Sequence, residues 1–467
     1  MYPPFSHRRR RTRRSRRRRR ERLVATLTYV VSVVAIAALM LFAWIVYNRS
    51  QDRAAAAWVR FAAAEPVIPV RRPQPMTAED SRWAAAAWQY FERNTSPRTG
   101  LPASVAGGRT VTMSDVGSYL MATIAAHRLG IIDVMAFNDR MGRLLATLSQ
   151  MPLFEGMLPN RAYDIQRLGM IGRDGDIDLV GTGWSGLDIS RLLLGFKIVC
   201  WEYPYFTPQI RDIVGRWRLD QLADNGMIQG AHLSRNGRIV RHREGRIGYE
   251  EYAARVLSLY NLDTREASEV RSHATIAEVD GVELAVDTRP SFPLEGLNLV
   301  TSDPFLFYGL ELGWDRQILP MAYQVYRVQR QRFATTGEAM AVGAGYLDDS
   351  GEPIRCAVIV DNRAWRCVNE AGENVRDAAF FSTGAAIGWA ALFETDYART
   401  LRDLAAPSHH PKRGWATGYR LRDGEPVTTY TVQSNALVLE AIHFLARGPL
   451  FNMMGDMPSD LLSRQTD

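Results

Sequence analysis

Residues 248–252 read Gly-Tyr-Glu-Glu-Tyr and place two adjacent carboxylates between two aromatic side chains. They follow a polar, glycine-rich segment that is typical of a loop, and they open an apolar run that predicts a helix. We take Glu250 and Glu251 as candidate acid–base groups, and Tyr249 and Tyr252 as candidate sugar-stacking rings. The same pattern also fits an ordinary helix start, because acidic side chains in the first turn complement the helix dipole.

Hydrolysis of a glycosidic bond needs a second carboxylate, and Asp115 is the candidate. The two groups stand about 5–5.5 Å apart in retaining enzymes and about 6.5–9.5 Å apart in inverting ones. Asp115 and Glu250 belong to different predicted helices, so such a gap can form between them. Neighbouring helical residues point about 100° apart, so only one of Glu250 and Glu251 is expected to face Asp115 squarely. Asp115 also fits a capping box with Thr112, and both interpretations stay open.

Further candidates for substrate binding stand near the starts of predicted helices. Asp303 precedes Pro304, which is a common way to begin a helix. Asp188 follows Ser185 in a capping pattern that we interpret as structural. The aromatic candidates also fit ordinary core packing. Besides the two tyrosines, the predicted substrate-binding set is Trp184, Asp303, Trp415, Gln433 and Asn435.

Metal-binding patterns are weak in this sequence. Asp174, Asp176 and Asp178 alternate in a glycine-containing segment and loosely resemble a calcium loop. The closing Glu of an EF-hand loop is missing, so a solvated loop is the simpler interpretation. The three cysteines do not have the spacing of zinc ligands. We therefore predict no metal site and no cofactor.

Helical segments alternate along the chain between nearly uncharged and amphipathic ones. A helix that is apolar on most sides is buried, whereas an amphipathic helix lies outside. The predicted inner helices are about 114–129, 183–200, 249–260, 303–313, 381–393 and 432–446. The predicted outer helices are about 77–93, 133–150, 206–223, 263–272, 315–333 and 394–404. This alternation predicts an all-α fold, an (α/α)6 barrel, with the inner helix starts lining one end.

Two insertions between the helices predict small β-hairpins. One is 274–287, with its turn at residues 280–281, and the other turns at residues 361–362. In the second hairpin Cys356 and Cys367 fall opposite each other. A cross-strand disulfide is therefore geometrically allowed, and two free thiols are the open alternative.

The N-terminal region is strongly basic and then uncharged. The first 22 of the 467 residues carry twelve Arg and one Glu, so the rest is mildly acidic although the formal net charge is +7. Residues 23–46 hold no charge and are long enough to span a hydrocarbon core of about 30 Å as a helix. Arginines before the span favour a cytoplasmic N-terminus. A cleaved signal peptide is the alternative, but its apolar region is only about 7–15 residues long.

We therefore predict five regions along the chain. An apolar span directly follows the Arg run and the folded part has no basic excess, so a nucleic-acid partner is not predicted. The regions are an Arg-rich cytoplasmic tail at 1–22, a transmembrane anchor at 23–47, a Pro-rich linker at 48–76, a barrel domain at 77–450 and a polar tail at 451–467.

Six stretches, in order along about 77–450, carry a resemblance to a known family: 114–120, 183–193, 245–254, 301–304, 381–389 and 431–440. The chain resembles the bacterial envelope proteins of domain family 3131. That family is distantly similar to glucoamylase-like (α/α)6 enzymes, including β-1,2-glucan hydrolases and transglycosylases. The resemblance implies the barrel fold, and it implies Glu where Asp303 stands in this sequence.

The predicted function is that of a periplasmic, membrane-anchored glycoside hydrolase or transglycosylase acting on an envelope or secreted polysaccharide. Asp115 and Glu250 form its predicted carboxylate pair, with Glu251 as the substitute for Glu250. The alternative is a non-catalytic glycan-binding or scaffolding component of an exopolysaccharide synthesis or export system. Predicted partners are a polysaccharide or oligosaccharide, the bacterial inner membrane, which the chain crosses once, and envelope polysaccharide machinery.

Overall fold

The computed structural model describes residues 67–291, 296–346, 353–375 and 378–452, together with scattered residues between 27 and 61. The chain divides into two compact units, Met1–Ala64 and Glu65–Asp467. In the first unit, the described residues between 27 and 44 are helical. Across the described residues, no helix combines the length and apolar character needed to cross a membrane. The Arg-rich tail, much of the predicted anchor and residues 453–467 lie outside the described residues.

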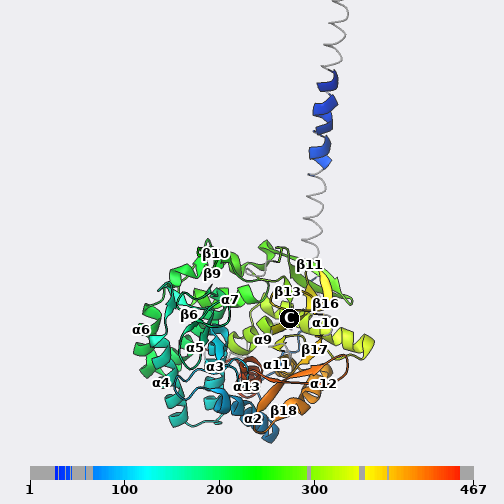
Figure 1. The fold of residues 1–467 in the computed structure, drawn as a ribbon. Helices are drawn as coiled ribbons and strands as arrows, with labels where there is room; N and C mark the ends of the chain where they lie inside the picture. Colours follow the sequence, from blue (N-terminus) through cyan, green and yellow to red (C-terminus); the bar gives the residue numbers. More distant parts are fainter. Residues whose placement is uncertain are drawn as a thin grey trace, which may run out of the picture. The chain divides into compact units, whose positions relative to one another are not determined.

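Six inner helices form the core of the second unit (Figure 1). Each contacts the next in the chain, and the last contacts the first, so the six close into a ring. Most of their side chains are buried, as their low charge predicts. The inner helices are α3 (Met113–Arg128), α5 (Gly186–Glu202), α7 (Tyr249–Ser258), α9 (Asp303–Phe307) with the π-helical turn η4 (Tyr308–Leu312), α11 (Thr383–Leu392) and α13 (Val432–Arg447).

Outer helices alternate with the inner ones and pack against them. Two are shorter than predicted, since α6 ends at Gly215 and α8 is a single turn before the strand that begins at Ala274. The outer helices are α2 (Ala78–Asn94), α4 (Val134–Gln150), α6 (Thr207–Gly215), α8 (Arg265–Ser268), α10 (Ile318–Thr336) and α12 (Asp396–Ala405). The predicted alternation of six inner and six outer segments is present in the described residues.

The two predicted hairpins are present with the predicted turns. Strands β11 (Ala274–Val279) and β12 (Val282–Asp287) pair around a two-residue turn in which both residues have positive φ. Strands β15 (Pro353–Val360) and β16 (Arg363–Val368) pair in the same way. Their register places Cys356 opposite Cys367, and the two are joined by a disulfide.

An all-α description is incomplete, because further small antiparallel sheets connect the helices. Strand β9 (Met227–Leu233) pairs with β10 (Ile239–Arg243), which lies within the polar segment that was predicted to be loop. Strand β19 (Gly414–Arg420) pairs with β20 (Pro426–Tyr430) just before α13. Strand β10 escapes prediction because four of its five side chains are exposed, so its sequence lacks the apolar alternation of a half-buried strand.

A buried arginine joins the inner helices at the centre of the ring. Arg191 of α5 donates from Nε and Nη2 to Glu311 Oε1 at 3.0 and 2.6 Å, and Nη2 also reaches Glu440 Oε1 of α13 at 3.1 Å. Its Nη1 donates to Ser118 Oγ of α3 at 2.6 Å. The Tyr252 hydroxyl of α7 donates to the other oxygen of Glu311. Burial and the neighbouring Glu311 raise the pKa of Glu440, and the charge of Arg191 opposes that increase.

Replacing Arg191 is expected to destabilise the barrel strongly. Arg191→Met leaves the Glu311 charge buried without its partner, and breaking a buried pair in this way costs roughly 3–5 kcal/mol. Chemical denaturation of the purified protein measures the loss. Arg218→Met is the matched control, because Arg218 pairs with Asp220 in solvent and its replacement should leave the midpoint unchanged. Equal midpoints for Arg191→Met and the unmodified protein would contradict a supporting role for this ion network.

Candidate active site

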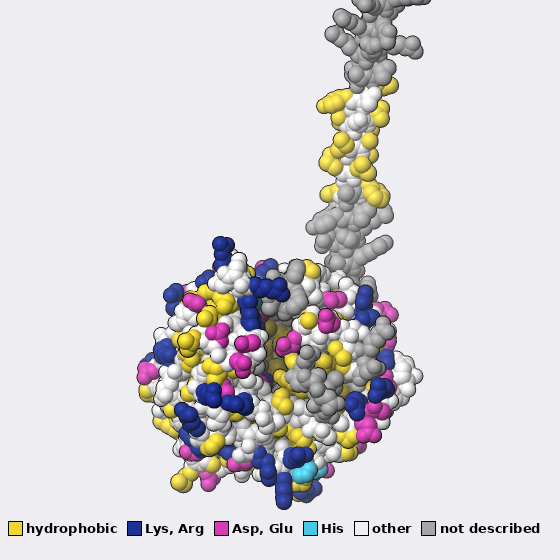
Figure 2. Space-filling model, in the orientation of Figure 1, with side chains coloured by type: hydrophobic (Ala, Val, Ile, Leu, Met, Phe, Trp, Pro, Cys, Tyr) yellow, Lys and Arg dark blue, Asp and Glu magenta, His cyan; other side chains and the backbone are white. Residues whose placement is uncertain are grey.

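Polar side chains gather where the inner helices begin. Asp115 and Asp188 are the third residues of α3 and α5. Each helix is preceded by a capping Thr or Ser whose hydroxyl accepts from the backbone N–H of that Asp. Tyr249 and Asp303 begin α7 and α9, and Gln433 is the second residue of α13. In the orientation of Figure 1, Figure 2 shows the surface hollowed near the centre of the helix ring, with Asp and Glu side chains at its rim.

Asp188 carries the most unusual carboxyl group of this set. It is partly exposed, and among the described residues its carboxylate makes no hydrogen bond or ion pair. Burial and then the neighbouring Glu244 raise its pKa to about 7, and Asp115 adds to the shift. Glu244 is fixed beside it, since Glu244 Oε2 accepts from Gly186 N at 2.6 Å at the start of the same helix. A pKa raised this far allows the carboxyl group to keep its proton close to neutral pH, which suits a general acid.

Two hydroxyl groups hold one of the two carboxylate oxygens of Asp115. Its Oδ2 accepts from Ser104 Oγ at 2.5 Å and from Thr112 Oγ1 at 2.9 Å. Burial raises the pKa of Asp115, and these two hydrogen bonds oppose the increase. Its Oδ1 makes no hydrogen bond within the described residues. Asp115 therefore takes part in the helix start, as one interpretation predicted, and still has a free oxygen for chemistry.

Asp303, Gln433 and Tyr249 form a polar wall beside the two aspartates. Asp303 is buried, and its oxygens accept from Ala344 N at 2.8 Å and from Gln433 Nε2 at 3.1 Å. Burial raises the pKa of Asp303 to about 6, against the Ala344 hydrogen bond. Tyr249 is partly exposed, and burial followed by the charges of Asp303 raises the pKa of its phenol. The charge of Arg355 on β15 opposes the increase in the pKa of Asp188 and of Asp303. The disulfide-linked hairpin therefore contributes a charge to the candidate site.

Glu250 and Glu251 do not belong to this group, which corrects their prediction as catalytic carboxylates. Glu250 is fully buried and accepts from Arg289 Nη2 at 2.5 Å. Glu251 accepts from Gly248 N at 2.5 Å and thereby closes the first turn of α7. Gly248 has φ of 91°, a conformation that suits glycine. One oxygen of Glu251 caps the helix start, and one oxygen of Glu250 forms an ion pair with Arg289.

Four predicted substrate-binding residues are core residues, which also corrects their prediction. Trp184 and Trp415 are fully buried, so neither ring has a face open to a sugar. Asn435 is fully buried as well, where its side chain accepts from Trp415 N at 2.7 Å and donates to Trp415 O. Tyr252 is directed into the ion network of Arg191. The periodic pattern that identified these helices could not separate side chains facing the opening from those facing the core.

Sequence reasoning interpreted Asp188 as structural and did not identify Glu244 or Arg355. A signal for Asp188 was present, because it follows Ser185 at the same three-residue offset at which Asp115 follows Thr112. Two equivalent positions on adjacent inner helices place both aspartates at the same end of the ring. Glu244 directly follows β10 and Arg355 lies on β15, so no helical pattern could have indicated them.

Comparisons with known proteins agree with this architecture. Residues 82–448 match the family described as "Protein of unknown function (DUF3131)". No curated protein matches the sequence. A glucoamylase-like protein from Bacteroides caccae is 14% identical, with a TM-score of 0.57 over 80% of this chain and 94% of that one. The endo-β-1,2-glucanase of Chitinophaga pinensis, in complex with sophorotriose and glucose, is 12% identical, with a TM-score of 0.57 and the same coverage.

A third solved structure is a mutant endo-β-1,2-glucanase of Talaromyces funiculosus with β-1,2-glucan. It is 11% identical and has a TM-score of 0.51 over 80% of this chain and 84% of that one. At these identities the likeness shows the fold, a glucoamylase-like (α/α)6 barrel.

The raised pKa of Asp188 predicts a pH-dependent stability. Between about pH 4 and pH 7 the unfolded chain releases the Asp188 proton while the folded protein keeps it, so this group lowers stability as pH rises through that window. Asp188→Asn removes the effect. We expect the variant to melt at a higher temperature than the unmodified protein at pH 8 and at the same temperature at pH 4.

The control for this experiment is Asp212→Asn, at an exposed position of α6. Its melting curve should follow that of the unmodified protein at both pH values. An Asp188→Asn variant that melts lower at pH 8 would show that the carboxylate stabilises the fold.

Proposed function

This chain belongs to the DUF3131 family, and from that premise we propose that it is a glycoside hydrolase or transglycosylase acting on an envelope or secreted polysaccharide. The observation that carries the proposal is the Asp188 carboxyl group, which has no protein partner among the described residues and a pKa of about 7 beside Asp115. A carboxyl group with a raised pKa lowers the stability of the folded protein as the pH rises, so a stabilising role does not explain Asp188. The glycan complexes of the structural neighbours support the same class of substrate.

The two aspartates have the environments that the reaction requires. Asp188 in its protonated form donates its proton to the leaving glycosidic oxygen. Asp115 in its ionised form, oriented by the Ser104 and Thr112 hydroxyls, activates water or attacks the anomeric carbon directly, depending on the separation of the carboxylates across the sugar. Two carboxyl groups in different environments can in this way divide the roles of acid and base.

The polar wall supplies the groups that position a sugar. The Asp303–Gln433 pair presents a fixed hydrogen-bonding edge, and Tyr249 adds a hydroxyl and an aromatic ring. A lyase reaction would need Tyr249 or a histidine as the base. Because burial and Asp303 raise the pKa of Tyr249, its phenol stays protonated and favours binding over proton abstraction.

We further propose that the second unit acts in the periplasm from an anchor in the inner membrane. The support is in the sequence, where twelve arginines precede an uncharged run of membrane-spanning length. Fractionation of cells should find the full chain with the membranes. Protease added to spheroplasts should digest the second unit, whereas protection of that unit would contradict this orientation.

Loss of either aspartate is expected to remove most of the activity. Acid–base assistance by one positioned group contributes about 10²–10⁴-fold, so Asp188→Asn and Asp115→Asn should lower kcat by that order. The purified full-length chain in detergent is incubated with a panel of bacterial glycans that includes β-1,2-glucan, and products are analysed by mass spectrometry. Asp212→Asn serves as the control and should retain full turnover.

Two outcomes would contradict the enzyme proposal. Normal turnover in Asp188→Asn would remove that residue from the mechanism. Retained binding of a glycan without any cleavage by the unmodified protein would support the alternative, a non-catalytic glycan-binding component of an exopolysaccharide system.

A further inference from the structure

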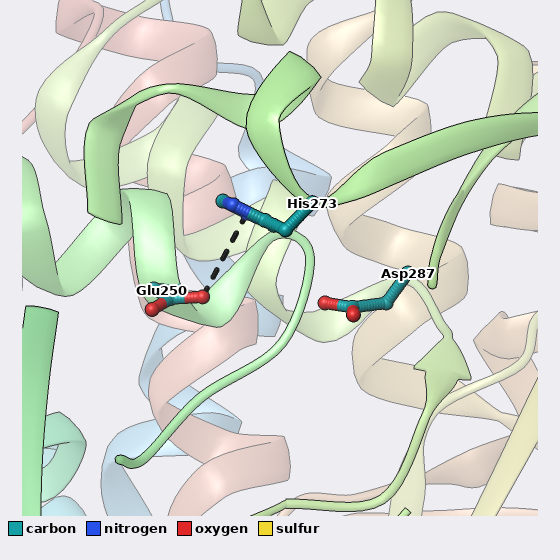
Figure 3. A group of neighbouring side chains, drawn as sticks. All are labelled: Glu250, His273 and Asp287. Carbon is teal, nitrogen blue, oxygen red and sulfur yellow. Dashed lines mark ion pairs between the residues drawn. The ribbon is translucent and has the colours of Figure 1, made fainter. Parts of the chain in front are cut away.

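A second cluster of ionisable side chains lies away from the aspartates, between α7 and the hairpin β11–β12. Glu250 and Glu251 come from the first turn of α7, His273 precedes β11, and Asp287 ends β12. All four are at most 6% exposed. The ligand atoms of Glu250, His273 and Asp287 lie within 4.8 Å of one another. Figure 3 shows the His273 ring and the Glu250 carboxylate directed toward each other, with the Asp287 carboxylate beside them.

The Ser272 hydroxyl group determines which way the hydrogen bond to the His273 ring runs. Ser272 Oγ donates its single hydrogen to Glu269 O at 2.8 Å, so it can only accept from His273 Nδ1, which lies 3.0 Å away. Nδ1 therefore carries the proton and Nε2 is directed at the carboxylates. Nε2 lies 3.6 Å from Glu251 Oε1 and 3.8 Å from Glu250 Oε2, too far for hydrogen bonds. Metal-binding histidines typically donate one ring N–H to a neighbouring acceptor and bind the metal with the other ring nitrogen.

The charges of the cluster do not balance. Three carboxylates face one guanidinium, since Arg289 Nη2 donates to Glu250 Oε2 at 2.5 Å and to Asp287 Oδ2 at 2.6 Å. Three buried atoms in the cluster have no hydrogen-bond partner among the described residues: His273 Nε2, Glu250 Oε1 and Glu251 Oε1. Buried polar atoms are almost always paired, and buried negative charge needs a cation. A divalent cation held by Glu250, His273 and Asp287 would give His273 Nε2 a partner and offset the excess negative charge.

We propose that Glu250, His273 and Asp287, with Glu251 beside them, bind a divalent transition-metal cation of the Zn²⁺ or Mn²⁺ type. One imidazole nitrogen with carboxylate oxygens suits these ions. The bound ion ties the hairpin β11–β12 to the first turn of α7. That turn begins with Tyr249, so the ion fixes the helix start that lines the candidate active site, and its role is structural.

Metal content and affinity test the proposal without any activity measurement. The purified full-length chain is treated with EDTA, dialysed, and titrated with ZnCl₂ or MnCl₂ in separate experiments. Elemental analysis by mass spectrometry should find about one ion per chain, and the melting temperature should rise with the added ion. His273→Gln removes the nitrogen ligand and should abolish both effects.

Ser272→Ala keeps the test decisive if His273→Gln fails to fold. Ser272 is exposed and contacts the ion only through the histidine ring, so its loss should weaken the affinity about 10–100-fold, as for other residues that orient a metal ligand. The matched control is Ser258→Ala, because Ser258 Oγ donates to a carbonyl three residues earlier just as Ser272 Oγ does. Affinity in this control should equal that of the unmodified protein.

Three results would overturn the metal site. In the first, the unmodified protein retains no ion and shows no thermal shift with either salt. Equal affinity in the unmodified protein, Ser272→Ala and His273→Gln would place the ion elsewhere. Loss of binding in His232→Ala alone would assign it to the other histidine pair, His232 and His242, whose Nδ1 atoms are 3.3 Å apart.

Discussion

The buried ion network of Arg191 is the interaction on which the rest of the barrel depends. One guanidinium is shared by Glu311 and Glu440, hydrogen-bonds Ser118, and is linked through Glu311 to Tyr252. These residues belong to α3, α5, α7, α13 and the turn that follows α9, so five of the six inner segments meet at one cation. Charges removed from water are costly unless each is paired and hydrogen-bonded, and this requirement fixes how the inner helices are rotated about their own axes.

That rotation determines which side chains remain at the helix starts. Arg191 of α5 is directed inward, and Asp188 lies about one turn closer to the start of the same helix. Only the backbone N–H of Asp188 takes part in capping, so its carboxylate is not used there. Tyr252 is drawn into the core on α7, and Tyr249 stays at the rim three residues earlier. The candidate site is therefore a consequence of the core network, since the same helices that bury their charges at the centre leave aspartates at one end.

The sequence was sufficient for the ring of helices, but only partly sufficient for the sheets between them and for the site. Apolar periodicity identified the inner helices, and two-residue turns with the right residue types located both predicted hairpins. Asp115, Asp303, Gln433 and Tyr249 were predicted at the helix starts, where they are found. Trp184, Trp415 and Asn435 were assigned to substrate because residue type cannot show whether a ring near a helix start is covered. Glu250 was assigned to catalysis because Arg289, which pairs with one of its oxygens, lies in a different segment and no local pattern connects the two.

The account rests on Asp188 acting as the general acid, and the pH dependence of turnover tests that claim most directly. If kcat/KM for glycan cleavage is measured from pH 5 to pH 9, a required protonated carboxyl with a pKa of about 7 predicts activity that falls as pH rises through that value. The residual activity of Asp188→Asn should lack this decrease. Activity of the unmodified protein that stays constant or increases from pH 6 to pH 8 would contradict the account.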